Sequence, residues 1–194
     1  MIGTVISLLA LAAPIPGQPA PSFTETGASG ATISLDQYAG KTVVLEWTND
    51  GCPFVKKHYG AKNMQQLQKR AAAEGIVWLQ VISSAPGKQG FVDADGAMAL
   101  NAERGAVVAD TLLDADGSMG RAYAAKTTPH MFIIDGDGVV RYNGAIDTIP
   151  TANADDIPNA QNYVAAALRD MKNGREVVTT VSKPYGCSVK YADS

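Results

Sequence analysis

Two cysteines, Cys52 and Cys187, are the residues of this 194-residue chain best suited to nucleophilic chemistry. Cys52 follows an Asn-Asp-Gly turn and precedes Pro53, a residue type favoured at the first position of a helix. A thiol there faces unpaired backbone N–H groups and the positive end of the helix dipole, and Lys56 and Lys57 add positive charge. These influences favour the thiolate, so Cys52 is predicted to be reactive. The alternative is a small buried side chain, because free cysteines are often buried.

The residue pattern also predicts the elements that would position Cys52. A β-branched and apolar run over residues 42–48 is typical of a buried strand, and Pro53 begins a helix over residues 53–74 with a break at Gly60. Further strands are predicted over residues 31–35, 76–83, 109–113, 131–135 and 139–142, and further helices over residues 93–104, 117–125 and 159–172. This order predicts an α/β protein with a central mixed β-sheet flanked by helices.

The composition limits the class of protein. Hydrophobic residues make up 46% of the chain and charged residues 18%, which supplies a full core and argues against disorder. The net charge is −3 and there is no basic run, so we expect no nucleic-acid partner. We expect no transmembrane segment in the mature chain, because no later segment is long and apolar enough to span a membrane. Two cysteines are too few for a disulfide scaffold or a structural zinc site.

The two ends of the chain are expected to lie outside the main domain, which we place at residues 18–173. Residues 1–13 are apolar and end in small residues, a pattern typical of a secretory signal, although no Lys or Arg precedes it. We therefore interpret residues 1–17 as a signal or N-terminal extension and expect a periplasmic or secreted protein; a buried first strand is the alternative. Residues 174–194 form a C-terminal tail that carries Cys187, which is either a partner of Cys52 or an inert or structural thiol.

A second informative segment, KTTPHMFIID over residues 126–135, places Pro129 directly before a predicted buried strand. Proline has no N–H to donate to a sheet, so the first position of a strand suits it. The bond between Thr128 and Pro129 is either cis or, as in most X-Pro bonds, trans. His130 follows, and it is either a packing residue or a side chain that raises the thiolate content of Cys52.

Three segments, GQPAPSF, VVLEWTNDGCPF and TTPHMFIIDGDGVVRYNGAI, resemble the thioredoxin-like superfamily. The likeness runs from residue 18 to residue 168 and is greatest to the redoxin branch, which holds the AhpC/TSA peroxiredoxins and the TlpA-like thiol-disulfide proteins. It implies a thioredoxin-like fold in which a cis Pro129 packs beside the sulfur of Cys52. It also implies that Glu46 is a buried acid that moves a proton to or from this thiol; a carboxylate facing solvent is the alternative. The resemblance further places a substrate groove around the thiol, lined by Trp47, Thr48, Pro53, Thr128 and His130.

The chain departs from its relatives at positions that bear on the reaction. Val55 stands where thioredoxins have the second cysteine of C-x-x-C, and Leu45 and Asn49 stand where peroxiredoxins have Pro and Thr. A protein disulfide and a peroxide therefore both remain candidate substrates. A thiolate that attacks either one needs a second thiol to resolve the product, and we expect Cys187 to supply it for Cys52. An external thiol is the expected electron donor, and no cofactor is implied, because sulfur carries the electrons.

A binding function on the same fold is the alternative to catalysis. By analogy with copper-handling relatives of this fold, Cys52 and His130 would be the metal ligands in that case. A redox-inactive binding module is the other form of this alternative. The cysteines and histidines lack compact ligand spacing, so we predict no metal site from spacing alone.

Overall fold

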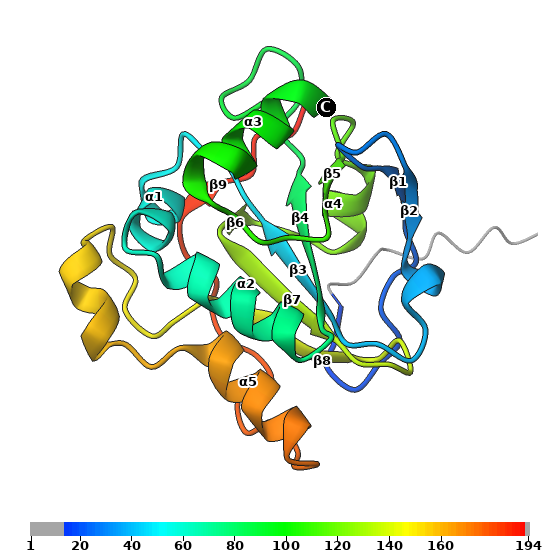
Figure 1. Cartoon of the computed structure of the whole chain (residues 1–194), viewed down its shortest axis with the longest axis vertical. Coiled ribbons are helices and arrows are strands. Elements are labelled where there is room, and N and C mark those ends of the chain that lie inside the picture. The colour runs from blue at the N-terminus through cyan, green and yellow to red at the C-terminus, as the bar shows by residue number, and fades with distance from the viewer. Residues whose placement is uncertain (1–13, 193–194) are drawn as a thin grey trace, which may run out of the picture.

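The structure, a computed structural model, describes residues 14–192, so the predicted secretory signal over residues 1–13 lies outside the described residues. Its central sheet has five strands, which are β3 Val43–Trp47, β4 Val77–Ile82, β5 Asp110–Leu113, β7 His130–Ile134 and β8 Val140–Gly144 (Figure 1). Their order across the sheet is β5-β4-β3-β7-β8. The pairs β3–β4 and β4–β5 are parallel, whereas β7 is antiparallel to both of its neighbours. The predicted α/β fold with a mixed sheet is confirmed.

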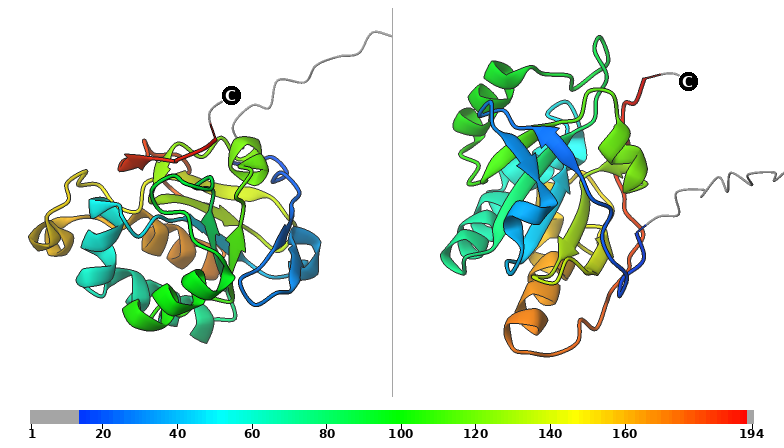
Figure 2. Two further views of the ribbon diagram at one scale, coloured as in Figure 1. Left: turned by 90° about the horizontal axis from the view of Figure 1, so that it is seen from above. Right: turned by 90° about the vertical axis from the view of Figure 1, so that its right-hand side faces the viewer.

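Helices cover the faces of this sheet (Figure 2). The helices are α1 Pro53–Gly60, α2 Asn63–Ala73, α3 Ala94–Arg104, α4 Ser118–Ala122 and α5 Tyr163–Lys172, with two 3-10 helices, η1 Leu35–Tyr38 and η2 Ala154–Asn159. Helices α1, α2 and α5 pack on one face of the sheet, against Val44 and Met131. Helix α4 and the N-terminal segment pack on the opposite face, against Leu45 and Phe132. Neighbouring residues of one strand therefore serve different cores, because side chains alternate across a strand.

The structure refines the predicted helix boundaries. The helix predicted over residues 53–74 is broken after Gly60, as expected, and Lys62 takes a left-handed conformation with φ of 61° between α1 and α2. The helix predicted over residues 159–172 begins only at Tyr163, because the Asn162 side chain accepts the Ala165 N–H at 2.8 Å and caps the first turn. The N-terminal hairpin of β1 Thr24–Thr26 and β2 Thr32–Ser34 contains one predicted strand, and β1 was not predicted.

The C-terminal tail runs along the edge of the sheet and returns to the start of α1 (Figure 1). Beside β8, the Asn143 N–H donates to the Thr180 carbonyl at 3.0 Å, and the Asn143 carbonyl accepts the Ser182 N–H at 3.1 Å. The last strand of the tail, β9 Cys187–Ser188, then pairs antiparallel with β6 Thr127–Thr128. The tail thus places the second cysteine opposite the residue that precedes the predicted cis-proline.

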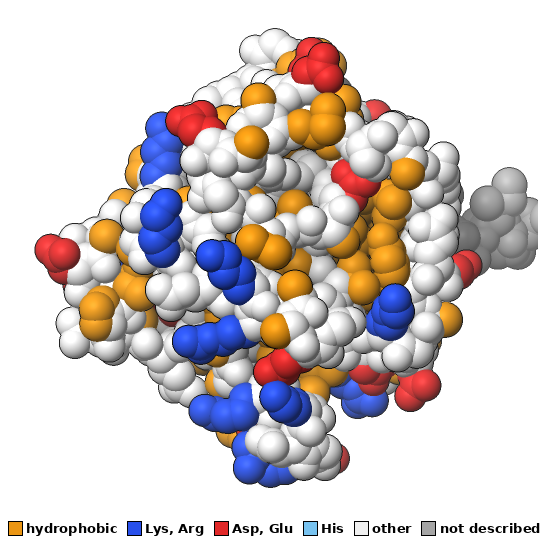
Figure 3. Space-filling model, in the orientation of Figure 1, with side chains coloured by type: hydrophobic (Ala, Val, Ile, Leu, Met, Phe, Trp, Pro, Cys, Tyr) orange, Lys and Arg blue, Asp and Glu red, His pale blue; other side chains and the backbone are white. Residues whose placement is uncertain are grey.

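Charged and apolar side chains are interspersed on the face of the molecule seen in Figure 3. Lysine and arginine side chains lie over α1, α2 and α5, and apolar and uncharged side chains interrupt them. This face is therefore a mixed surface rather than a single charged one. Within residues 14–192, no helix has the length and the hydropathy that crossing a bilayer would require.

Candidate redox site

Cys52 lies at the N-terminal cap of α1, as the sequence predicts. Its backbone is extended, with φ of −83° and ψ of 121°, and Pro53 begins the helix. The Cys52 N–H donates to the Asn49 carbonyl at 3.0 Å, and the Cys52 carbonyl accepts the Lys56 N–H at 2.9 Å. The Asn49 side chain also accepts the Gly51 N–H at 2.9 Å, which fixes the turn. These bonds join close neighbours in the sequence, so the local segment itself sets the position of the thiol.

The surroundings of Cys52 favour the thiolate. Burial alone would raise the pKa of Cys52, which is fully buried, but polar contacts with Cys187, Thr128 and the Val55 N–H outweigh burial and lower the pKa. The Val55 N–H belongs to the first turn of α1, where the sequence predicts this stabilisation. Lys57 does not contribute as expected, because its ammonium turns to the Ile149 carbonyl at 3.1 Å.

Cys187 lies beside Cys52, and both are free thiols. Its strand β9 places it opposite Thr128, and its side chain packs against the core cluster that contains Cys52. Burial, the hydrogen bond to Cys52 and the Cys52 charge together raise the pKa of Cys187 to about 11. As the pH rises, the pair therefore ionises first at Cys52, while Cys187 keeps its proton. The structure thus brings together two cysteines that lie far apart in the sequence.

Thr128 and Pro129 form the third part of the site. The bond between them is cis, in agreement with the expectation from sequence. The Cys52 thiol donates a hydrogen bond to the Thr128 carbonyl oxygen at 3.0 Å. The Thr128 hydroxyl is buried and makes no conventional hydrogen bond within the described residues, yet it helps to lower the Cys52 pKa. It is therefore a donor that remains available to charge on the sulfur.

Glu46 lies on the same face of the sheet as Cys52, and it is fully buried rather than exposed. Tyr59 Oη and Trp78 Nε1 each donate to its carboxylate at 2.8 Å, and Gln68 Nε2 donates at 3.2 Å. Burial raises the pKa of Glu46, and these bonds offset the effect only in part. Among the described residues, none of the hydrogen bonds of Glu46 reaches Cys52. Its role in proton transfer remains a prediction.

Two residues predicted to line the substrate groove lie elsewhere. Trp47 is fully buried on the face opposite Cys52, where its indole donates to Ser83 Oγ at 3.0 Å. The His130 ring stacks on Phe132, with centroids 4.6 Å apart. Both ring nitrogens are engaged, one with the Lys126 N–H at 3.2 Å and one with the Asn143 side chain at 2.8 Å. Burial lowers the pKa of His130 to about 4. The prediction that Trp47 and His130 line the groove is therefore wrong, because side chains alternate along each strand and these two face the other core.

The other predicted groove residues remain near the thiol. Pro53 is exposed at the start of α1, directly after Cys52. Thr48 directly follows β3 and is buried, and its hydroxyl has no hydrogen-bond partner among the described residues. Its backbone N–H donates to the Val81 carbonyl at 3.0 Å. Their contact with a substrate stays a prediction.

A buried cluster that the sequence analysis missed holds the tail just before Cys187. The Tyr185 hydroxyl donates to the Asp147 carboxylate, and His58 Nε2 lies 3.4 Å from the same hydroxyl. Asp147 also lies 3.7 Å from the Lys57 ammonium and 3.8 Å from His58. The Tyr185 ring packs edge-on against Phe54, with centroids 5.8 Å apart. The available signal was the sequence KPYGC, in which an aromatic residue precedes Gly-Cys.

A second set of contacts holds the tail just after Cys187. The Lys190 carbonyl accepts the Ala85 N–H at 2.8 Å. The Tyr191 hydroxyl donates to the Ala125 carbonyl at 2.8 Å, and the Arg121 guanidinium lies over the Tyr191 ring at 4.9 Å. Cys187 therefore lies on a strand that is fastened on both sides.

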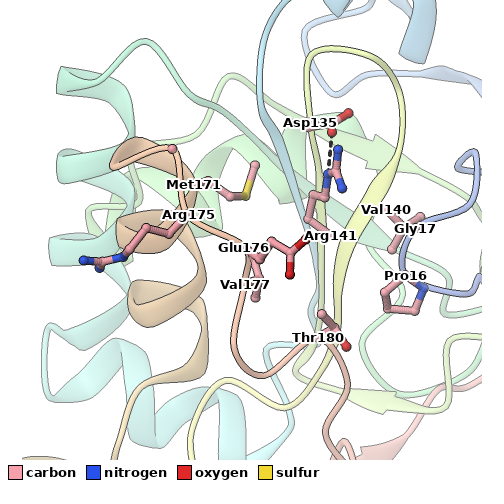
Figure 4. Close-up of a pocket in the computed structure, with 11 residues that line it drawn as sticks. Pro16, Gly17, Asp135, Val140, Arg141, Met171, Arg175, Glu176, Val177 and Thr180 are labelled. Atoms are coloured by element: carbon pink, nitrogen blue, oxygen red, sulfur yellow. Dashed lines mark hydrogen bonds and ion pairs between the residues drawn. The ribbon is translucent and has the colours of Figure 1, made fainter.

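The remaining polar clusters and cavities offer no competing site. Residues 14–192 contain no group of three or more His, Cys, Asp or Glu arranged to hold a metal ion. A cavity of about 510 Å³ lies between the N-terminal segment, β8 and the start of the tail, where Arg141 pairs with Asp135 (Figure 4). Neither cysteine lines this cavity, so we assign it no part in thiol chemistry.

Known proteins resemble this chain in both sequence and structure. Residues 16–143 match the AhpC/TSA family. A thiol peroxidase from Mycobacterium bovis is 32% identical over 158 residues, which cover 79% of this chain and 86% of the relative. A hypothetical protein from Sinorhizobium meliloti superposes with a TM-score of 0.75 at 21% identity, covering 94% of this chain and 98% of that one. A protein described as a thiol:disulfide interchange protein DsbE from Chlorobium tepidum superposes with a TM-score of 0.55 at 25% identity, covering 68% and 85%. These likenesses confirm the predicted thioredoxin-like fold.

Proposed function

Because the chain belongs to the AhpC/TSA family, we propose that it reduces hydroperoxides, with Cys52 as the nucleophile and Cys187 as the resolving thiol. The observation that carries this proposal is the placement of Cys187 beside Cys52. Strand β9 pairs Cys187 with Thr128, whose carbonyl oxygen lies 3.0 Å from the Cys52 sulfur. A nucleophile with a lowered pKa and a thiol with a pKa of about 11 lie side by side before any oxidation takes place. The likeness to a thiol peroxidase favours a peroxide as the oxidant.

In the first step, the Cys52 thiolate attacks one oxygen of the hydroperoxide. An S–O bond forms, the O–O bond breaks, and the leaving oxygen takes up a proton and departs as an alcohol or water. Cys52 becomes a sulfenic acid and loses two electrons to the peroxide. The Thr128 hydroxyl supplies a hydrogen bond to the sulfur or to the leaving oxygen, because it is buried without a conventional partner in the described chain.

In the second step, the Cys187 sulfur attacks the Cys52 sulfenic acid, which forms a disulfide and releases water. An external thiol donor then reduces the disulfide and supplies two electrons. It attacks the Cys187 sulfur, because Cys187 is partly exposed whereas Cys52 is fully buried. Attack there expels Cys52, whose lower pKa makes it the better leaving group, and leaves a mixed disulfide between Cys187 and the donor. A second donor thiol then attacks the donor's sulfur and expels Cys187, so that the donor ends as a disulfide. No other cofactor takes part in this cycle.

Reduction of a protein disulfide is the second candidate function, and the likeness to the Chlorobium tepidum protein favours it. The pairing of β9 with β6 argues against it, because a polypeptide would have to displace the tail to reach Cys52. A copper site made by Cys52 and His130 has less support, since both His130 ring nitrogens are hydrogen-bonded within the protein.

We also propose that the protein is exported to the periplasm or the medium. This proposal rests only on the apolar pattern of residues 1–13 and the small residues that end it. Fractionation of cells that produce the full chain with a C-terminal tag tests it: recovery of the tagged protein in the cytoplasm alone contradicts export.

Peroxide consumption by the purified, reduced chain tests the proposed reaction. Without added thiol, the wild type should consume hydrogen peroxide and cumene hydroperoxide and form the Cys52–Cys187 disulfide. Cys52→Ser should lower consumption to the rate of buffer alone. Cys187→Ser should consume peroxide once and accumulate a sulfenic acid at Cys52 that dimedone traps. Ser188→Ala, on the exposed side of β9, is the matched control and should follow the wild-type course. Wild-type consumption no faster than that of Cys52→Ser would refute the proposal.

A further inference from the structure

The tail occupies the backbone edge beside Cys52 at which an extended peptide would pair. We propose that β9 is a built-in substitute for a peptide substrate, so that the site admits small oxidants and excludes polypeptide disulfides. This inference rests on the proposed function, since it assumes that Cys52 is the attacking thiol, and it names the class of oxidant that this thiol accepts.

The first support is the register of the strand pair. Thr128 lies opposite Cys187 and Thr127 opposite Ser188, and the Val189 N–H donates to the Lys126 carbonyl at 3.1 Å. A peptide that adds to a sheet edge gains its affinity from such main-chain hydrogen bonds. Because β9 already uses this edge, an incoming peptide has to break these bonds before it can form its own.

The second support is the close approach of the tail to the thiol at Gly186. A Cβ atom on Gly186 would lie 2.0 Å from the Thr128 carbonyl oxygen, the same oxygen that lies 3.0 Å from the Cys52 sulfur. Gly186 also has φ of 132°, a conformation that residues with a side chain rarely adopt. Glycine thus lets the tail lie against the reactive segment.

The third support is that the strand is fastened at both ends. Tyr185 is held by Asp147 and Phe54 before the cysteine, and Tyr191 is held by Ala125 after it. A segment tethered in this way competes at an effective concentration in the millimolar range. A free polypeptide at ordinary cellular concentration does not displace it, whereas a small oxidant needs no strand pairing at all.

The fourth support is that Cys187 takes the position that a residue of a bound peptide substrate would take. An extended peptide paired with β6 would place a residue opposite Thr128, and in this chain that residue is Cys187. The tail therefore presents its own sulfur beside Cys52, opposite the residue whose carbonyl oxygen lies 3.0 Å from the Cys52 sulfur, where a substrate would present its disulfide. The same placement serves resolution in the proposed cycle and keeps other sulfur-bearing chains away from the nucleophile.

The experiment compares two disulfide probes in a Cys187→Ser background, where Cys52 is the single thiol. One probe is a short uncharged peptide whose cysteine carries thionitrobenzoate, and the other is mercaptoethanol carrying the same group. Cys52 attacks the sulfur of the peptide or of mercaptoethanol, a new disulfide forms, and coloured thionitrobenzoate leaves with the electron pair. Its release therefore measures the rate with each probe, independently of any peroxidase activity.

Gly186→Ala should displace β9, because the added methyl group has no room beside Thr128. Loss of one or two backbone hydrogen bonds predicts a rise of about tenfold in the rate with the peptide, and a much smaller rise with mercaptoethanol. Gly30→Ala is the matched control, since Gly30 also has a positive φ, 83°, but open space around it. It should leave the ratio of the two rates unchanged.

Tyr185→Phe loosens one anchor without adding bulk, and it should change the ratio in the same direction by a smaller factor. This variant decides the matter if Gly186→Ala loses its native circular dichroism. Equal acceleration of both probes would show that β9 is only a general cover, and an unchanged ratio in both variants would overturn the inference. If the mercaptoethanol probe fails to react with any variant, Cys52 is not the nucleophile and the proposed function falls as well.

Discussion

At the start of α1, backbone hydrogen bonds between close neighbours hold Cys52, whereas Cys187 is held by backbone pairing and side-chain contacts with distant parts of the chain. The Cys52 N–H bonds to Asn49 three positions earlier, and its carbonyl bonds to Lys56 in the helix that follows. The strand of Cys187 depends on Tyr185 reaching Asp147, on the other side of α5 in the sequence. The geometry of the nucleophile is therefore a local property, and that of its partner is a tertiary one. Changes remote from both sulfurs should disturb the tail and leave the cap of α1 in place.

The largest expected effect comes from removing the acid that anchors the tail. Asp147→Ala leaves the buried Lys57 ammonium and the half-buried Tyr185 hydroxyl without their acidic partner. Breaking a buried ion pair by removing one member costs about 3–5 kcal/mol. Urea unfolding should show a loss of this size, against little change for Asp137→Ala, an exposed acid in the β7–β8 turn. Equal stability of Asp147→Ala and Asp137→Ala would mean that the cluster does not hold the tail.

The second effect is a dependence of the folding stability on pH, which arises from His58 in the cluster that holds the tail. Burial lowers the pKa of His58 to about 4 from 6.5, and Lys57 adds to this while Asp147 opposes it. The folded state thus favours neutral His58, and its contribution is complete above pH 6.5 and is lost as the pH falls to about 4. A shift of this size corresponds to about 3 kcal/mol.

Urea unfolding at a series of pH values checks this dependence. Wild type should lose more stability between the two pKa values than His58→Gln, which has no imidazole to charge. The difference between the two proteins cancels groups that titrate with the opposite sign, such as Glu25, whose pKa burial raises to about 7. Parallel pH curves for wild type and His58→Gln would contradict the assignment.

A smaller effect is expected from a single hydroxyl. Tyr185→Phe keeps the ring against Phe54 but removes the hydrogen bond to Asp147, which should cost about 1 kcal/mol. Amide hydrogen exchange at Cys187 and Val189 should then rise several-fold, while the amides of α1 stay protected. Tyr163→Phe, on α5 and packed against Tyr142, is the control and should leave both segments unchanged. An equal rise in amide exchange in β9 and α1 would show that the two segments open together.

The smallest effect is a shift in one titration. Burial and the presence of Cys52 raise the pKa of Cys187 to about 11, so Cys52→Ser should lower it toward, but not to, the ordinary 9.0, because burial remains. Alkylation with iodoacetamide across pH, followed by mass spectrometry, measures the midpoint at each sulfur. In wild type, Cys52 should ionise at a lower pH than Cys187. An unchanged Cys187 profile in Cys52→Ser would mean that the two sulfurs do not interact.

The sequence was sufficient wherever the structure is local. The strand before Cys52, the turn, the helix that Pro53 begins and the break at Gly60 all follow from residue types within a few positions. The mixed sheet followed from the order of predicted strands and helices. The predicted start of α5, at residue 159, was four residues too early, because the helix begins after the Asn162 cap and apolar spacing does not reveal that cap.

The sequence was insufficient where the two faces of a strand had to be distinguished, or where segments far apart in the chain come into contact. Strands β3 and β7 are buried on both sides, so their apolar runs do not reveal that Trp47 and His130 face away from Cys52. The cluster of Asp147, His58 and Tyr185 joins three separate segments, and no pattern within any one of them points to the others. For the same reason, the sequence did not decide whether Cys187 lies beside Cys52.

The disulfide of the proposed cycle would close a loop that takes in most of the described chain, from residue 52 to residue 187. A crosslink that closes a loop of about 100 residues removes freedom from the unfolded chain worth about 4.7 kcal/mol in the chain-entropy model. The oxidised protein should therefore melt at a higher temperature than the reduced one. The melting temperature thereby reports the supply of reductant, since a melting curve shows what fraction of the protein still carries the disulfide.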